Sequence, residues 1–153
     1  MSACPWPMVE LLPHRPPMVL LDALRCFDDE SAIAVAVMRP DHPFIRPQGV
    51  PAHVGMEMMA QACGAHVGAL ARSAGGAVQV GFLLGTRGYG ASQPWFPLGA
   101  ELEIEVHRVF QEDGMGVYDC RIVVGGAEIA QARLNLYQPP DMEMAVTRLR
   151  GAT

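Results

Sequence analysis

The pattern of hydrophobic and polar positions predicts one long, almost wholly apolar helix over Pro51–Arg72. Before its last residue, the only polar side chains in this stretch are His53, Glu57, Gln61 and His66. A helix that faces solvent carries polar residues along one side, so we expect protein to surround this helix on nearly all sides. The proline at its start and the glycines shortly after its end are typical helix boundaries.

Alternating or apolar runs on both sides of the helix predict β-strands. The predicted strands are Met18–Phe27, Ser31–Arg39, Ala77–Gly90, Ala100–Gln111, Met115–Val124 and Glu128–Tyr137. The clearest alternation places Leu102, Ile104 and Val106 on one face of its strand and acidic residues on the other. Two strands, a helix and four more strands predict an α+β fold, in which the apolar face of an antiparallel sheet covers the helix.

Length and charge limit the classes of function. The chain has 153 residues and a mass of 16.5 kDa, which predicts a single domain over residues 1–140 and a polar tail over 141–153. Half of the residues are hydrophobic, which excludes a disordered chain. The net charge of −5, without a basic run, argues against nucleic-acid binding.

The cysteines and the terminal segment point to a cytoplasmic protein. The four cysteines are far apart and form no CxxC pair, so reduced thiols are expected, and no metal-ligand spacing is present. The first residues lack the basic and apolar regions of a signal peptide. The polar residues inside the long helix argue against a membrane span.

The strongest candidate for chemistry is Glu57 near the start of the predicted helix. A carboxylate on an apolar surface is costly unless it is used, and in such a place it can act as an acid or base. The bland alternative is a carboxylate that only favours the first helical turn. The amide of Gly55 can polarise a carbonyl oxygen, because a residue without a side chain permits close approach. Gln61, one turn further on, either orients the carboxylate, binds substrate or satisfies buried backbone groups.

Three histidines are candidates for a general base or for the wall of a pocket. His42 lies in the loop before the helix, where catalytic groups are common, although a lone loop histidine is more often a surface residue. His53 precedes Glu57 by one helical turn and is either the base or a helix-start residue. His14 lies in a rigid proline-rich segment and is read as structural or as a pocket wall.

Three segments together resemble a known enzyme family. They are LPHRPPMVLLDAL (Leu12–Leu24), GMEMMAQA (Gly55–Ala62) and FLLGTRGYG (Phe82–Gly90). They are similar to the hotdog-fold 3-hydroxyacyl-[acyl-carrier-protein] dehydratases, and nearest to the dehydratase-like proteins of aryl polyene pigment clusters. The resemblance implies a long central helix wrapped by an antiparallel sheet, a dimer formed through the sheets, and no cofactor.

The resemblance also implies a reaction. Water is eliminated from a 3-hydroxyacyl thioester on acyl carrier protein, giving a trans-2-enoyl thioester. A histidine takes the proton α to the carbonyl, the acid matching Glu57 assists departure of the hydroxyl, and the Gly55 amide polarises the carbonyl. In such dimers the histidine and the acid come from opposite subunits. Docking of an acidic carrier would need arginines, for which Arg15, Arg46, Arg72 and Arg87 are candidates.

The chain departs from the family pattern at the loop histidine. Typical members carry HFPG, with the histidine eight residues before the proline that starts the helix; here Pro43 holds that place. His42 is one residue away and is followed by Pro-Phe. Either a one-residue insertion restores the role of His42, or His53 takes it over. Two other functions stay open: a non-catalytic hotdog partner or acyl-binding subunit, and a hotdog thioesterase in which Glu57 or Gln61 activates water.

Overall fold

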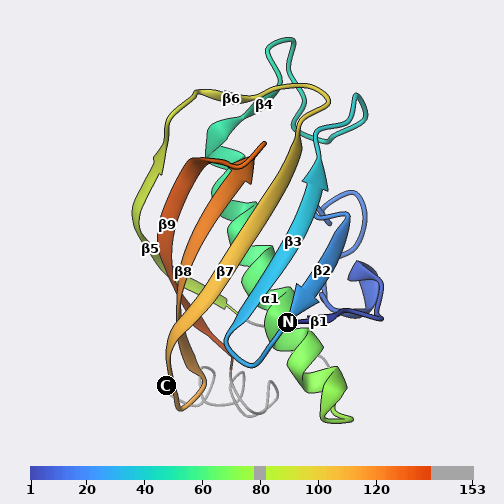
Figure 1. Ribbon diagram of the computed structural model, residues 1–153, viewed down its shortest axis with the longest axis vertical. Coiled ribbons are helices and arrows are strands. Elements are labelled where there is room, and N and C mark those ends of the chain that lie inside the picture. The colour runs from blue at the N-terminus through green and yellow to red at the C-terminus, as the bar shows by residue number, and fades with distance from the viewer. Residues whose placement is uncertain (78–81, 139–153) are drawn as a thin grey trace, which may run out of the picture.

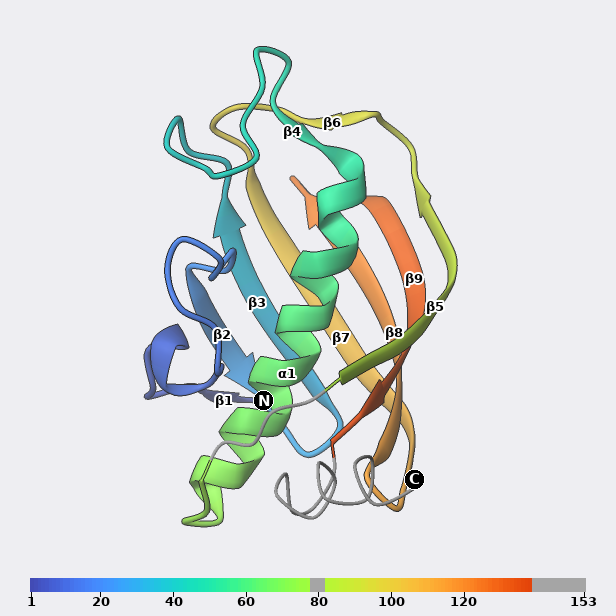
Figure 2. The same cartoon turned by 180° about the vertical axis from the view of Figure 1, so that it is seen from behind.

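A single long helix lies across one face of a seven-stranded sheet in the computed structural model (Figures 1 and 2). The structure describes residues 1–77 and 82–138. The predicted tail over 141–153, and part of the strand predicted over Ala77–Gly90, lie outside the described residues. No helix in the described part of the chain is long and apolar enough to cross a bilayer.

The sheet is antiparallel throughout, with the strand order β1-β2-β3-β7-β8-β9-β5. Its strands are β1 (Ser2–Ala3), β2 (Ala23–Phe27), β3 (Ser31–Val37), β5 (Phe82–Ala91), β7 (Glu101–Glu112), β8 (Met115–Val124) and β9 (Ala127–Tyr137). The remaining elements are 3-10 helices η1 (Met8–Glu10) and η2 (Ala52–Val54), helix α1 (Gly55–Ser73), and the short pair β4 (Val50–Pro51) and β6 (Trp95–Phe96). The predicted α+β fold is confirmed.

Small residues on the inner face of the sheet make room for α1. Ala34 pairs with Ile104, and Ala36 pairs with Leu102, and all four side chains are fully buried beneath the helix. The branched residues of β3, such as Val35, lie on the opposite and partly exposed face. Because alanine side chains are short, the helix can approach β3 closely while the larger residues of β7 fill the remaining core.

The strand predicted over Met18–Phe27 begins only at Ala23. The preceding residues form a loop in which the Asp22 amide still donates to the Val35 carbonyl oxygen of β3, while the Leu20 amide and the Asp22 carboxylate make side-chain hydrogen bonds. The Leu20 amide donates to Gln61 Oε1 at 2.9 Å, and the amide of Val37 donates to the Asp22 carboxylate at 2.6 Å. The apolar pattern of this segment predicts a strand, but Leu20 and Leu21 are apolar because both are buried in the core.

One flank of α1 is less covered than the sequence predicts. On the inner side the helix is buried, and at Gly68 the backbone of Leu11 approaches so closely that an added Cβ would lie 2.4 Å from the Leu11 carbonyl oxygen. The flank that carries Glu57, Ala60 and Gly64 is only partly buried. The helix is therefore not surrounded by its own chain on nearly all sides.

Candidate active site

The open flank of α1 forms one wall of a pocket of about 870 Å³. The segment before β2 supplies a second wall through Leu12 and His14, and the ends of β7, β8 and β9 supply a third. Glu57 and Gln61 from α1 and Tyr118 from β8 also line it. A cavity of this size, with a few convergent polar groups among apolar ones, suits a small ligand or an acyl chain.

Glu57 lies in the first turn of α1 with its carboxylate directed toward two other polar side chains of the pocket. Its Oε1 accepts a hydrogen bond from Gln61 Nε2 at 3.2 Å and lies 3.7 Å from His14 Nε2. The Glu57 side chain is 43% exposed, so solvent or a ligand reaches it from the pocket. The carboxylate is thus oriented by a neighbour and remains accessible.

Gln61 is held rigidly in place. The residue is 1% exposed, and both the oxygen and the nitrogen of its side-chain amide form hydrogen bonds. Its Oε1 accepts from the Leu20 amide, and its Nε2 donates to the Met18 carbonyl at 2.7 Å as well as to Glu57. The first two bonds hold the loop before β2 against the helix. The third uses the same rigid amide to orient the carboxylate.

His14 is the only histidine among the described residues that line this pocket. Its side chain is 35% exposed, and its Nε2 faces Glu57. Its Nδ1 is buried and has no hydrogen-bond partner in the described part of the chain. The segment before β2 therefore delivers an imidazole and α1 delivers a carboxylate to the same place.

His42 lies outside the pocket lining, in the loop between β3 and β4. The imidazole is buried, its Nδ1 accepts a hydrogen bond from the Phe44 amide at 3.1 Å, and its ring lies 6.0 Å from the ring of Phe44. Burial lowers the pKa of His42, against an opposing effect of the nearby Asp22 and Asp41 carboxylates. Burial therefore favours the neutral form of the His42 imidazole.

The helix start itself is tightly packed. The Gly55 amide already donates to the Ala52 and His53 carbonyl oxygens. A Cβ at Gly55 would lie 2.5 Å from the Tyr89 hydroxyl, which donates a short hydrogen bond to the Ala52 carbonyl. His53 is exposed in η2 and does not line the pocket. The structure thus brings together Glu57, Gln61 and His14, and leaves His42 and His53 elsewhere in the chain.

Sequence reasoning missed several polar residues of the pocket, among them Arg108 and Tyr118. These two residues pair directly across β7 and β8, in the register that continues the inward-facing positions of both strands. Tyr118 donates to His66 Nδ1 at 2.7 Å, while His66 Nε2 donates to the Asp28 carbonyl at 2.8 Å. The alternation of β7 was the available signal, since Arg108 follows Val106 on the same face. Among the described residues, no His, Cys, Asp or Glu group could hold a metal ion.

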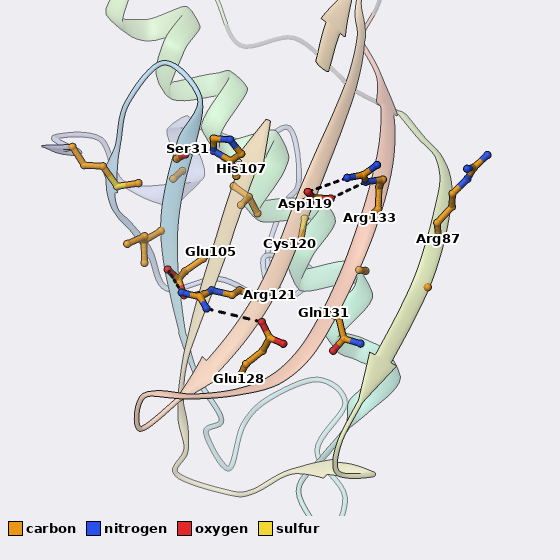
Figure 3. A pocket seen from close by; sticks show the side chains of 16 residues that line it. Ser31, Arg87, Glu105, His107, Asp119, Cys120, Arg121, Glu128, Gln131 and Arg133 are labelled. Atoms are coloured by element: carbon orange, nitrogen blue, oxygen red, sulfur yellow. Dashed lines mark hydrogen bonds and ion pairs between the residues drawn. The ribbon is translucent and has the colours of Figure 1, made fainter. Parts of the chain in front are cut away.

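A second hollow, of about 540 Å³, lies on the outer face of the sheet (Figure 3). Its charges are paired across strands: Arg121 contacts Glu105 at 2.8 Å, and Arg133 contacts Asp119 at 2.7 Å. The Arg133 guanidinium lowers the pKa of Asp119. These are exposed ion pairs on a solvated face of the sheet, and each contributes little to the stability of the fold. We regard the α1 pocket as the candidate site.

Comparison with known proteins identifies the family. The sequence matches the ApeP-like dehydratases over residues 6–147. The chain belongs to the ApeP-like dehydratase family. The dehydratase heterocomplex ApeI:P from Xenorhabdus doucetiae contains a chain of 30% identity and TM-score 0.86, and the match covers 93% of this chain and 97% of that one. The prediction of a hotdog-fold acyl-thioester dehydratase, which the sequence resemblance implies, is therefore confirmed.

More distant structural matches show the fold alone. A hypothetical thioesterase with coenzyme A from Streptococcus pneumoniae has 14% identity and TM-score 0.60, covering 75% of this chain and 83% of that one. The PaaI protein of Escherichia coli has 15% identity and TM-score 0.60, covering 77% and 78%. A comparison with curated proteins gives no significant match.

Proposed function

We propose that this dehydratase eliminates water from 3-hydroxyacyl thioesters carried by acyl carrier protein and releases the trans-2-enoyl thioester. The observation that carries the proposal is the Glu57 carboxylate, oriented by Gln61 at the wall of a pocket large enough for an acyl chain. Glu57 is the acid that assists departure of the β-hydroxyl. Gln61 and His14 contact either the substrate or the Glu57 carboxyl group. The base is one of three histidines, His14, His42 or His53.

The thioester carbonyl lies at the start of α1 in this proposal. Helix-start amides carry a partial positive charge that stabilises negative charge developing on a carbonyl oxygen. The Gly55 amide would take this role by exchanging its bond to Ala52 for one to the substrate. Polarising the carbonyl makes the α-proton more acidic, which is the difficult part of the elimination.

The chain works as one subunit of a hotdog dimer, and we favour a heterodimer. The structural relative is itself a dehydratase heterocomplex. Strand β5 ends the sheet order, and no described strand pairs with its outer edge. An unpaired edge strand is a template for pairing with another chain. Pairing there would extend the sheet into the partner and bring its loops toward the α1 pocket.

Arg15 is the best placed arginine for docking the carrier. It follows His14 directly, and its guanidinium bonds only to the Pro13 and His14 carbonyl oxygens among the described residues. Arginine pairs well with phosphate and carboxylate groups. Arg72, by contrast, already lies 3.7 Å from Glu10. A cytoplasmic location fits the proposal, since Cys63 and Cys120 are free thiols 3.6 Å apart.

The test is an assay of the purified protein, with its hotdog partner where one co-purifies, on a 3-hydroxyacyl thioester. Enoyl product and free thiol are followed together. We expect enoyl product without thiol, and we expect Glu57→Gln to abolish it while Glu128→Gln, on the outer face of the sheet, does not. Release of thiol would instead support a thioesterase. No product from the wild-type complex would support a non-catalytic subunit.

A further inference from the structure

Arg108 places a cation without an acid partner in the wall of the α1 pocket. It lies on β7 with its side chain partly buried, and it lines the same pocket as Glu57. Its guanidinium donates to the Asp29 carbonyl oxygen at 2.8 Å. Among the residues that the structure describes, no carboxylate forms an ion pair with it, although Asp113 also lines the pocket. A partly buried cation without an acid is costly unless a ligand supplies an acceptor.

Buried hydrogen bonds hold this guanidinium in place. His66 Nε2 donates to the Asp28 carbonyl oxygen at 2.8 Å, which leaves the lone pair of the neutral imidazole at Nδ1. The Tyr118 hydroxyl, which is buried, donates to that lone pair at 2.7 Å, so its own oxygen is left to accept from Arg108. Burial raises the pKa of Tyr118, and the hydrogen-bonded Arg108 guanidinium opposes this shift. Because a guanidinium has five N–H donors, these bonds leave others free to face the pocket.

The cation lies far along the pocket from the reacting end. His66, which holds Tyr118, comes nine positions after Glu57 on α1, which corresponds to about 13 Å along the helix axis. The turn between β7 and β8 likewise lies toward the C-terminal end of α1 (Figure 2). The stretch between the two ends is lined by small and apolar helix residues, Ala60, Gly64 and Val67. An acyl chain that starts at Glu57 and follows these residues therefore brings its far end to Arg108.

We propose that the pocket accepts acyl chains whose far end carries an oxygen acceptor, and that Arg108, held by Tyr118, binds this oxygen. The inference rests on the proposed dehydration and names the class of substrate that it serves. The oxygen of a hydroxyl or carboxylate group accepts from the free guanidinium N–H groups. A chain that ends in a methyl group covers these donors and leaves them without an acceptor. Arg108 thus determines specificity and takes no part in proton transfer.

The experiment compares 3-hydroxyacyl thioesters of matched length that end in a primary alcohol, a carboxylate or a methyl group. The purified protein is used, with its hotdog partner where one co-purifies. For long chains we expect the wild type to prefer an oxygen-ended substrate by about 10–100-fold in kcat/KM. Chains too short to span about 13 Å should show no preference. The ratio between the alcohol and the carboxylate shows whether the favoured end group is charged.

Variants assign the preference to the guanidinium. Arg108→Met removes the donors, so kcat/KM for long oxygen-ended chains should fall to the value for methyl-ended chains, while short chains are turned over as before. Tyr118→Phe keeps the ring but removes the hydroxyl that holds Arg108, and it should reduce the preference in part. Arg121→Met, on the outer face of the sheet, is the matched control and should keep the full preference. Melting temperatures show whether each variant is folded.

The results separate this inference from the proposed function. Dehydration of long chains with equal kcat/KM for oxygen and methyl ends would overturn the role of Arg108 and leave the function intact. A wild-type preference that Arg108→Met retains would do the same. If no thioester is dehydrated, the function is overturned, and binding of saturated acyl thioesters then tests Arg108 separately. Calorimetry should still show tighter binding of oxygen-ended chains by the wild type and not by Arg108→Met; equal affinities would overturn the inference as well.

Discussion

The role of Gln61 gives the sharpest quantitative prediction. Replacing Gln61 with leucine keeps the side-chain volume and removes three hydrogen bonds at a site that is 1% exposed. The Leu20 amide is then left buried without an acceptor, which costs about 1–3 kcal/mol, and the Met18 carbonyl loses its donor. We expect a loss of about 3 kcal/mol in the free energy of unfolding. For a chain of this size that corresponds to a fall of about 6–12 °C in Tm.

Activity should fall in Gln61→Leu for a separate reason, because Glu57 loses the donor that orients it. A hydrogen bond to a charged group contributes about 1.5 kcal/mol or more, which corresponds to about tenfold in kcat/KM. The variant Gln61→Glu separates the two effects. Its carboxylate still accepts from the Leu20 amide, but it cannot donate to Met18 and it repels Glu57.

The measurements are thermal unfolding, amide hydrogen exchange at Leu20, and dehydration kinetics on folded protein. Gln131→Leu is the matched control, since this glutamine is exposed on β9. We expect Leu20 to exchange faster in Gln61→Leu and to stay protected in Gln61→Glu, while both lose activity. An unchanged Tm with normal protection at Leu20 would refute the reasoning, since it would mean that the buried amide does not depend on Gln61.

Two further predictions concern the helix and its buried histidine. Gly68→Ala should destabilise the fold by about 1–3 kcal/mol, because the new Cβ meets the rigid Leu11 backbone at 2.4 Å; Gly64→Ala, whose Cβ meets only a flexible side-chain end at 3.2 Å, should change unfolding in urea by less than about 1 kcal/mol. Burial lowers the pKa of His66 in the folded state below its usual 6.5, so the unfolded chain binds more protons as pH falls, and stability should be full above pH 6.5 and decline below it. His66→Gln should flatten the dependence of Tm on pH between 8 and 5, whereas the exposed His107→Gln should leave it unchanged.

Local patterns predicted the elements because each pattern has a local physical cause. The alternation in Ala100–Gln111 arises from a strand with one face on the core, and the structure places β7 there with Leu102, Ile104 and Val106 buried. The strand prediction is wrong over residues 18–22 for the same reason. The leucines of this segment are apolar because they are buried in the core. The local pattern does not show that the Leu20 amide donates to Gln61, 41 positions away, instead of to a neighbouring strand.

The candidate site was predicted only as far as single residues reveal their environment. Glu57 was found because a carboxylate on an apolar helix is unusual, and Gln61 because it lies one turn away on the same face. The meeting of His14 with Glu57 depends on how the segment before β2 folds back onto α1, and 43 positions separate the two residues. Likewise, the hydrogen bond from the Phe44 amide to His42 Nδ1 depends on the fold of the loop and is not visible in the sequence.

The exposed flank of α1 is the strongest structural reason to expect a partner. The sequence has the composition of a helix covered on nearly all sides, yet the flank with Ala60, Gly64 and Val67 is only partly buried in the single chain. Apolar surface left in water costs about 25 cal/mol for each Å², and small residues such as Ala60 and Gly64 permit close approach by another backbone. The proposed second subunit, paired through the free edge of β5, would cover this flank. It would also close the pocket over His14 and Glu57 and exclude water from the Glu57 carboxyl group.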